Sequence, residues 1–365
     1  MWAVILFSIL FCVLLVFCIL LLLSPGKIRP ILDKDGAPLA GSISEKVRVD
    51  INGERQGMFI RGKDVANPII LFLHGGAGMP EYFLTQRYPI ALEEHFTVCW
   101  WERRGSGLSY HSGMSPESMT VEQIVSDTIA VTNYLRSRFS KDRIILMAHS
   151  GGTFFGIQAA KRAPECFLAY VGIAQLAYQL RSERYSYELM VRLYGEKGNV
   201  RMVRRMQRHP PTMEVPLPKG YMALRDKAMH GVGIGTTHEM RSVFTGVFIP
   251  VMLERAYTLR EKVGIWKGKF FSERCFWDKM LATDLTKMVT GLEIPTYFCS
   301  GRFDYTVSID EARSYLQKIQ APLKGFYTFE RSAHSPMFEE PDMMLRVLKE
   351  DVLTLSNQLA DGARR

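Results

Sequence analysis

The chain has 365 residues, 47% of them hydrophobic, which is enough for one large α/β domain with an insertion or for two domains. Its formal net charge is +9, but the basic residues are spread along the chain rather than gathered in one tail. No zinc-ligand spacing, recognition-helix pattern or aromatic RNA-binding strand accompanies this charge, so we expect no nucleic-acid partner. Attraction to an anionic membrane surface would explain the basic balance equally well.

The N-terminal stretch 2–23 is continuously apolar apart from Ser8 and two cysteines. About 20 apolar residues suffice to cross a bilayer, so residues 1–24 are predicted to form a single-pass transmembrane anchor. A cleavable signal peptide is the alternative, but no basic residue precedes the run and no small-residue cleavage site follows it. Lys27 and Arg29 come directly after the run, which predicts that the catalytic body lies on the cytoplasmic side of the membrane.

The six cysteines show no C-x-x-C spacing. We therefore expect buried free thiols rather than a disulfide framework or a metal site. The sequence also contains no N-x-S/T acceptor for glycans. Both features favour a body that faces the cytosol.

Residues 25–41 are predicted to be a linker, because proline, glycine and aspartate interrupt any pattern there. Short apolar runs then alternate with helix-like periods, which predicts an α/β fold with a mostly parallel sheet covered by helices on both faces. The predicted strands are a hairpin at 43–51 and 58–61, then 69–73, 96–101, the run before Ser150, 167–174, 294–300 and 324–329. The predicted helices are 120–139, opened by a capping box of Thr120 and Gln123, then 153–163, 309–319 and 342–358.

From residue 176 to residue 290 this alternation stops. The stretch is rich in methionine, arginine and aromatic residues at helical spacing, and it is predicted to be a helical cap. It interrupts a core formed by residues 42–175 and 291–365, and part of its apolar surface should roof a pocket. Four arginines at helical spacing are interpreted as a solvated face, with contact to lipid headgroups as the alternative: Arg201, Arg204, Arg205 and Arg208.

One apolar run ends abruptly at Ser150, flanked by Ala148, Gly151 and Gly152 and followed by the helix predicted at 153–163. In this strand–turn–helix setting a serine hydroxyl is exposed on a tight turn as a nucleophile, and only small neighbours fit. The G-x-S-x-G pattern is met except at its first position, where Ala148 replaces glycine. The alternative is an ordinary serine at a helix N-cap.

Partners for that serine follow the last two predicted strands. Asp304 comes after the strand at 294–300 and His334 after the strand at 324–329. Such loops lie at the carboxyl edge of an open α/β sheet, where ligands bind. Taken singly, Asp304 could be a turn residue and His334 a packing histidine. The order Ser150, Asp304, His334 nevertheless predicts a triad in which His334 takes the serine proton and Asp304 orients the imidazole.

Hydrolysis by such a triad also requires an oxyanion hole of backbone N–H groups. Gly151 offers one N–H directly after the nucleophile. The glycine loop after residues 69–73 offers the other from Gly76 or Gly75, with Gly76 preferred; the alternative for this loop is a plain turn. This chemistry needs no metal or organic cofactor.

Over residues 42–357 the chain resembles the α/β-hydrolase superfamily and, within it, the prolyl-iminopeptidase-like group of serine aminopeptidases. The resemblance is carried by His74-Gly75-Gly76-Ala77-Gly78, Glu102-Arg103-Arg104-Gly105-Ser106-Gly107, the turn at Ser150, Gly301-x-x-Asp304-x-x-Val307 and Ser332-Ala333-His334-x-Pro336. It implies an aminopeptidase that cleaves small peptides at a free N-terminus through an acyl-enzyme. A carboxylesterase or lipase acting on acyl esters shares the machinery, and a non-catalytic binding scaffold is a further alternative.

The sequence departs from that group near the expected substrate pocket. Ala77 replaces a proline, Glu102-Arg103 replaces Asp-Gln, and Gly151 stands where a tryptophan is common. The group's cap often supplies carboxylates that hold the substrate amine. Candidates of this kind here are Glu183, Glu188, Glu239 and Glu254, each of which could instead be a solvated helix residue.

Overall fold

The computed structural model of the chain describes residues 1–363 and contains one eight-stranded sheet with the order β1-β2-β4-β3-β5-β6-β7-β8. β1, β2 and β4 pair antiparallel, and every neighbour from β4 to β8 pairs parallel. The strands are β1 (Ile43–Ile51), β2 (Glu54–Gly62), β3 (Ile69–Leu73), β4 (Thr97–Glu102), β5 (Ile144–His149), β6 (Phe167–Ile173), β7 (Thr296–Gly301) and β8 (Lys324–Phe329). The predicted α/β-hydrolase fold is thus confirmed.

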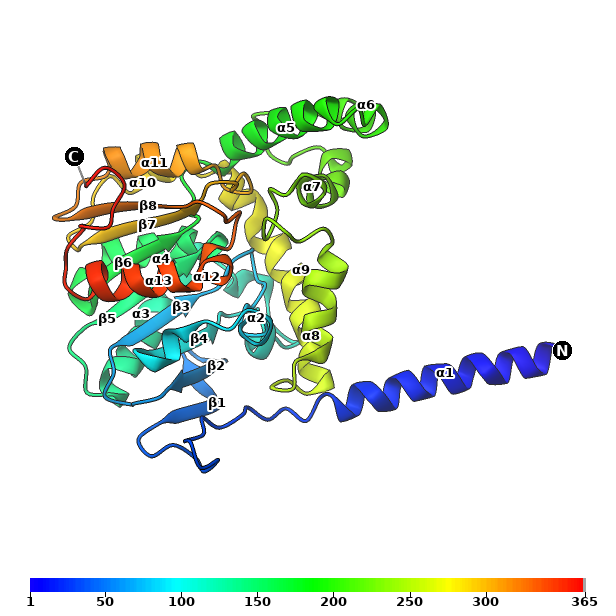
Figure 1. Cartoon of the computed structure of the whole chain (residues 1–365), viewed down its shortest axis with the longest axis horizontal. Coiled ribbons are helices and arrows are strands. Elements are labelled where there is room, and N and C mark those ends of the chain that lie inside the picture. The colour runs from blue at the N-terminus through cyan, green and yellow to red at the C-terminus, as the bar shows by residue number, and fades with distance from the viewer. Residues whose placement is uncertain (364–365) are drawn as a thin grey trace.

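Helices cover both faces of this sheet (Figure 1). α3, α4 and α11 pack on one face, and α13 with the short α2 packs on the other. Their bounds are α2 (Leu84–Arg87), α3 (Val121–Arg138), α4 (Gly151–Arg162), α11 (Ile309–Lys318), α12 (Pro336–Glu339) and α13 (Pro341–Val347). Short 3-10 turns lie in the loops at η1 (Ala91–Glu94), η2 (Gly107–Ser109), η3 (Pro116–Ser118) and η4 (Pro164–Cys166).

The all-apolar sequence of β3 follows from this two-sided cover. Successive side chains of a strand point to opposite faces. Ile69, Leu71 and Leu73 therefore join the core under α3 and α4, whereas Ile70 and Phe72 join the core under α13. A strand with a helix layer on each side has no solvent-facing position for a polar residue.

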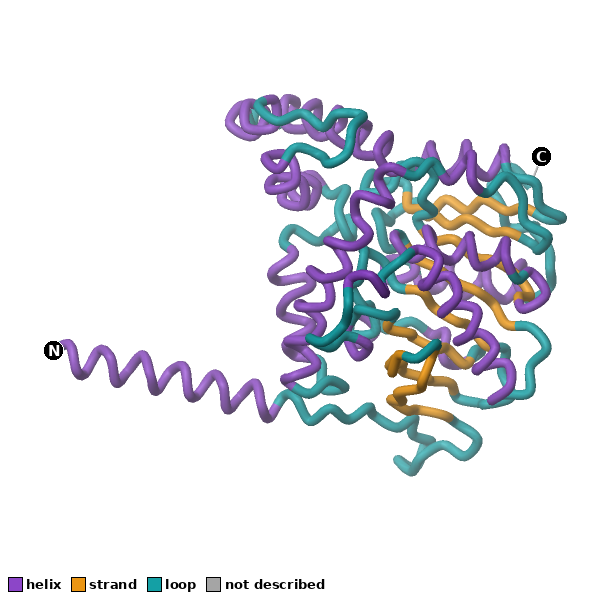
Figure 2. Tube along the Cα trace, turned by 180° about the vertical axis from the view of Figure 1, so that it is seen from behind, coloured by secondary structure: helices purple, strands orange, loops and turns teal. Residues whose placement is uncertain are grey.

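A group of helices is inserted between β6 and β7 and has an apolar cluster of its own, built largely from α5, α6 and α7. The group lies beyond the carboxyl ends of the central strands, as Figures 1 and 2 show. Its elements are α5 (Gln179–Glu196), α6 (Val200–Gln207), α7 (Lys219–Val232), the π-helical η5 (Phe244–Phe248), α8 (Ile249–Leu253), α9 (Leu259–Ala282) and α10 (Leu285–Met288). We call this group the cap.

The N-terminal helix α1 (Trp2–Leu22) projects alone from the body (Figures 1 and 2). Its window Val4–Leu22 has a mean hydropathy of 3.4 and no part of it is buried. Length and composition suit a membrane crossing, although a signal sequence near an N-terminus has the same properties. All six cysteines are free, but the expectation of burial is wrong for Cys12 and Cys18, which are exposed on α1.

The predicted helix at 342–358 is too long. α13 and the π-helical turn η6 (Leu348–Val352) cover only its first part. Buried Asp351 accepts hydrogen bonds from the backbone amides of Gln358 (3.0 Å) and Leu359 (2.9 Å), which turns the chain back instead of continuing the helix.

The predicted capping box is only half formed. Thr120 accepts a hydrogen bond from the Gln123 amide at 3.0 Å. The Gln123 side chain, however, donates to Asp127 at 2.7 Å instead of returning to the N-cap, because a buried carboxylate requires donors more than an exposed helix end does.

Asp127 joins the edge hairpin to α3 and to the loop after β4. Its carboxylate is fully buried and forms an ion pair with Arg104, whose Nε donates at 2.6 Å. It also accepts from the side-chain amides of Asn52 (2.8 Å), Gln56 (2.7 Å) and Gln123. The buried charge is therefore paired and surrounded by donors, as its burial requires.

We expect Asp127→Ala to lower the free energy of unfolding by about 3–5 kcal/mol, because it leaves the buried Arg104 guanidinium with only the distant Glu54 carboxylate, at 3.8 Å, as a counter-ion. Glu122→Ala, which removes an ion pair with Arg162 between two solvent-exposed side chains, should cost less than about 1 kcal/mol. Urea unfolding of both variants in the same detergent would measure the difference. Equal costs would show that the Asp127 cluster is not structural.

Candidate active site

Ser150 is the residue at which β5 turns into α4, with backbone angles φ 50° and ψ −123°. A positive φ is uncommon for a residue with a side chain and persists where the surrounding structure imposes it. The Ser150 side chain makes no capping hydrogen bond, so it is not an ordinary N-cap. Its hydroxyl is half-buried.

The small residues around Ser150 are required by space. A Cβ added to Gly152 would lie 2.4 Å from the Leu73 carbonyl oxygen, and one added to Gly151 would lie 2.2 Å from that of Gly76. Ala148 is accommodated in the turn because its neighbour in α4 is Gly156, where an added Cβ would come within 2.9 Å of the alanine methyl. The alanine that replaces the first glycine of the G-x-S-x-G pattern is thus accommodated by a glycine in the helix that follows the turn.

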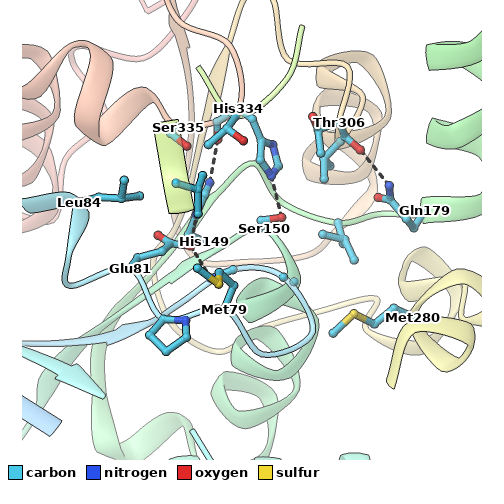
Figure 3. Close-up of a pocket in the computed structure, with 18 of the residues that line it drawn as sticks. Met79, Glu81, Leu84, His149, Ser150, Gln179, Met280, Thr306, His334 and Ser335 are labelled. Carbon is cyan, nitrogen blue, oxygen red and sulfur yellow. Dashed lines mark hydrogen bonds and ion pairs between the residues drawn. The ribbon is translucent and has the colours of Figure 1, made fainter. Parts of the chain in front are cut away.

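The structure brings Ser150, His334 and Asp304 together from three strand ends, and Figure 3 shows the first two of them facing each other. His334 Nε2 lies 2.7 Å from Ser150 Oγ, and its Nδ1 lies 3.0 and 3.1 Å from the two carboxylate oxygens of Asp304. Asp304 is fully buried and also accepts from the Val307 amide at 3.0 Å. Because a carboxylate only accepts, His334 Nδ1 carries the proton and Nε2 is left to accept from the serine hydroxyl.

The glycine loop after β3 lies against the nucleophile turn, and its two candidate amides differ. The Gly75 amide already donates to Glu81 Oε1 at 2.6 Å. Gly76 has a φ of 57°, and its carbonyl oxygen lies so close to Gly151 that no side chain fits at Gly151. Of the two loop glycines, Gly76 is therefore the one whose N–H is not committed to Glu81.

Buried Arg103 stabilises this loop through hydrogen bonds to its carbonyl oxygens. Its guanidinium donates to the carbonyl oxygen of His74 and to those of Gly76 and Ala77, the latter two at 3.3 Å. Its charge also lies over the Phe155 ring, 5.0 Å from the centroid. Burial lowers the pKa of Arg103 to about 9, an effect that nearby Glu81 opposes. With the loop carbonyls committed to Arg103, the loop's orientation relative to Ser150 is fixed.

His149, directly before Ser150, was not recognised from the sequence. Its Nδ1 donates to Glu81 Oε1 at 2.8 Å and its Nε2 donates to the His334 carbonyl oxygen at 2.7 Å. Burial alone would lower the pKa of His149, but the Glu81 carboxylate and the His334 carbonyl raise it above its ordinary value. His149 thus links the loop that carries Glu81 to the loop that carries His334.

A cavity of about 220 Å³ opens in front of Ser150. Its lining includes the apolar side chains of Met79, Phe83, Leu84 and Met280, together with Gly76, Gly151 and His334. The cavity is smaller than the ~300–1,000 Å³ typical of sites for drug-sized ligands, so it fits a small substrate group.

None of the four cap glutamates lines this cavity. Glu188 is exposed and pairs with Arg184, Glu239 is exposed, and Glu254 is buried at the far end of the cap, where it accepts from the Ala256 amide. Glu183 is fully buried and is neutralised by Arg225, whose Nε and Nη2 each donate to it at 2.6 Å.

The cavity wall instead contains two buried acceptors that the sequence analysis missed, Glu81 and Gln179. Glu81 Oε2 and Gln179 Oε1 have no hydrogen-bond partner among the described residues. The Gln179 amide cannot be reversed, because its Nε2 donates to Glu183 Oε1 and to the Thr306 carbonyl, both at 2.8 Å. No local motif marks either residue; only their position in space does.

Comparison with known proteins gives consistent results. Residues 68–202 match the family model described as the alpha/beta hydrolase fold. The chain is 31% identical over 313 residues to a probable aminopeptidase, YbaC, of Bacillus subtilis (strain 168), covering 85% of this chain and 97% of that protein.

Two solved structures share the fold. The proline iminopeptidase-related protein TTHA1809 from Thermus thermophilus has 19% identity and a TM-score of 0.54, over 86% of this chain and 98% of that chain. The proline iminopeptidase of Mycobacterium smegmatis has 12% identity and a TM-score of 0.59, over 85% of this chain and 98% of that chain. The chain therefore belongs to the α/β-hydrolase family.

Proposed function

We propose that this hydrolase is a membrane-anchored serine aminopeptidase that removes the first residue from small peptides. The observation that carries the proposal is that two residues lining the cavity in front of Ser150, Glu81 and Gln179, each keep a buried side-chain oxygen, Oε2 and Oε1, without a hydrogen-bond partner among the described residues. A free peptide N-terminus is an ammonium group that only donates hydrogen bonds. Two acceptors without donors, one of them on a carboxylate, suit such a group.

The catalytic step would proceed as follows. Ser150 Oγ attacks the carbonyl carbon of the first residue while His334 Nε2 takes its proton. Asp304 stabilises the imidazolium, and the N–H groups of Gly76 and Gly151 stabilise the oxyanion. His334 then gives the proton to the departing amine, leaving an acyl-enzyme. Water, deprotonated by His334, releases the amino acid and restores Ser150.

The position of Gln179 supports recognition of the substrate amine by the cap. Glu183, the most buried of the predicted cap carboxylates, is fully occupied by Arg225, Tyr221 and Gln179. A buried charge paired in this way is not available to a substrate. Glu183 instead fixes the Gln179 amide with its oxygen unpartnered, so the cap would present a neutral acceptor. Glu81 would add the one carboxylate oxygen, Oε2, that its ion pair with His149 leaves without a partner among the described residues.

A carboxylesterase acting on acyl esters is the alternative, because the same triad and oxyanion hole cleave esters. The apolar lining from Phe83, Leu84 and Met280 would accept an acyl chain. The small volume favours one amino-acid side chain over a long acyl chain.

The membrane part of the proposal rests on α1. Its apolar window of 19 residues is close to the ~20 that span a hydrocarbon core. Lys27 and Arg29 follow the helix, which favours a body on the cytoplasmic side.

We expect Ser150→Ala to reduce kcat for alanine and proline naphthylamides by at least about 10⁴-fold, and His334→Ala to have a similar effect. The double variant should be no slower than either single one, because the residues act as a unit. Ser137→Ala, at an exposed position of α3, is the matched control. Wild-type-like turnover in folded Ser150→Ala would refute the proposed nucleophile.

Glu81→Gln tests the recognition of the amine. The change keeps a carbonyl oxygen for the Gly75 amide but removes the charge, which should lower the preference for alanine naphthylamide over its N-acetylated form by about 10- to 100-fold. Glu188→Gln removes an exposed cap carboxylate and should leave that preference unchanged. The readout is the ratio of the two kcat/KM values. If Glu81→Gln lowers both values equally, Glu81 only supports the loop.

A further inference from the structure

An apolar patch lies on the outside of the cap. It is formed by η5, α8 and the outer side of α9, where large side chains are exposed instead of packed: Phe244 (59%), Phe248 (37%), Ile249 (37%), Leu253 (52%), Val263 (44%) and Phe270 (55%). We call these six residues the cap patch. Large exposed apolar side chains gathered on elements that contact one another mark an interaction site rather than ordinary surface.

The cap patch is rich in aromatic rings. The Phe244 and Phe248 rings stack with centroids 5.2 Å apart, and Phe248 lies 5.4 Å from the Trp266 ring. The helical segment Phe244–Leu253 contains no charged residue. Aromatic side chains beside an uncharged short helix are typical of segments that lie in the membrane–water interface.

The end of α1 is fixed to the same part of the cap. Lys262 of α9 donates to the Leu23 carbonyl at 3.0 Å and to Ser24 Oγ at 2.9 Å. The chain then continues along the cap, where the Lys27 amide donates to the Arg255 carbonyl at 3.2 Å. The point where α1 leaves the body is thus held beside the α8–α9 corner, and α8 lies on the side from which α1 projects (Figures 1 and 2).

Basic side chains lie beside this corner. A groove of about 1,060 Å³ is lined by α9, the segment around η2 and Leu21 of α1, and its charged lining residues are Arg48, Arg55, Arg260, Lys267 and one carboxylate, Glu261. At the other end of the cap, α6 and its C-cap carry four more exposed arginines (Figure 1): Arg201, Arg204, Arg205 and Arg208. Positive charge flanking an apolar patch complements an anionic lipid surface.

We propose that the cap patch lies in the bilayer interface next to α1. The body would then contact the membrane surface directly instead of being attached to the membrane through α1 alone. The occupant of the patch is lipid, with anionic headgroups in the flanking basic groove. Val247, which lines the cavity, belongs to η5 between Phe244 and Phe248. The cap segment that closes the cavity would therefore contact the membrane directly, and apolar peptides partitioned into the interface would reach the site along it.

Spin-label accessibility on the full chain in nanodiscs of phosphatidylcholine and phosphatidylserine tests this placement. All labelled variants are made in a parent chain that carries Cys12→Ser and Cys18→Ser. The other four cysteines are buried or half-buried, and any label that they take up is removed by subtracting the signal of the parent chain. Labels at Phe248→Cys and Phe270→Cys are compared with Leu10→Cys in α1 and with Leu355→Cys, an exposed leucine near the C-terminus.

We expect the labels at positions 248 and 270 to shift toward the high oxygen and low nickel-chelate accessibility of position 10, while position 355 stays accessible to the chelate. Chelate accessibility at 248 and 270 equal to that at 355, with position 10 protected, would overturn the placement and leave the anchor intact. Chelate access at position 10 would refute the anchor in the proposed function, and this inference with it.

Discussion

The site depends on one constraint: β3 and β5 are neighbours in a parallel sheet, so the loops at their carboxyl ends must meet. Gly151, after β5, approaches Gly76, after β3, so closely that no Cβ fits between them. This contact places the two backbone segments that would form the oxyanion hole beside Ser150. β7 and β8, neighbours further along the same sheet, bring Asp304 and His334 to the same edge.

Charge burial then decides what the cavity can bind. Arg103 holds the carbonyls of the glycine loop, and Glu81 is held by Gly75 and His149 through one oxygen only. In the cap, Arg225 occupies Glu183, which in turn orients Gln179. Glu81 is paired with His149 and Glu183 with Arg225, as burial requires, while Glu81 and Gln179, which both line the cavity, each keep one buried oxygen without a partner among the described residues. In the proposed function, recognition of a donor group would follow from the way these buried charges are paired.

Much of the fold could be predicted from the sequence, because buried strands and tight turns restrict residue type locally. The apolar run Ile69–Leu73 and the turn at Ser150 have such patterns, and the strands form as expected. The proximity of Ser150, Asp304 and His334 follows once the sheet order is known. Glu81 and Gln179 could not be found in this way, since a carboxylate or an amide in a loop or helix has no distinctive spacing. Likewise, Asp351 ends the last helix through contacts made only after folding.

The most direct test of the account is to treat the purified full chain with a fluorophosphonate probe and to locate the adduct by tandem mass spectrometry. The geometry predicts a single modified serine, Ser150, because its hydroxyl donates to a histidine that is itself held by a buried carboxylate. His334→Ala should abolish the adduct without unfolding the chain. A folded wild-type chain that stays unlabelled, or one labelled at another serine, would contradict the account.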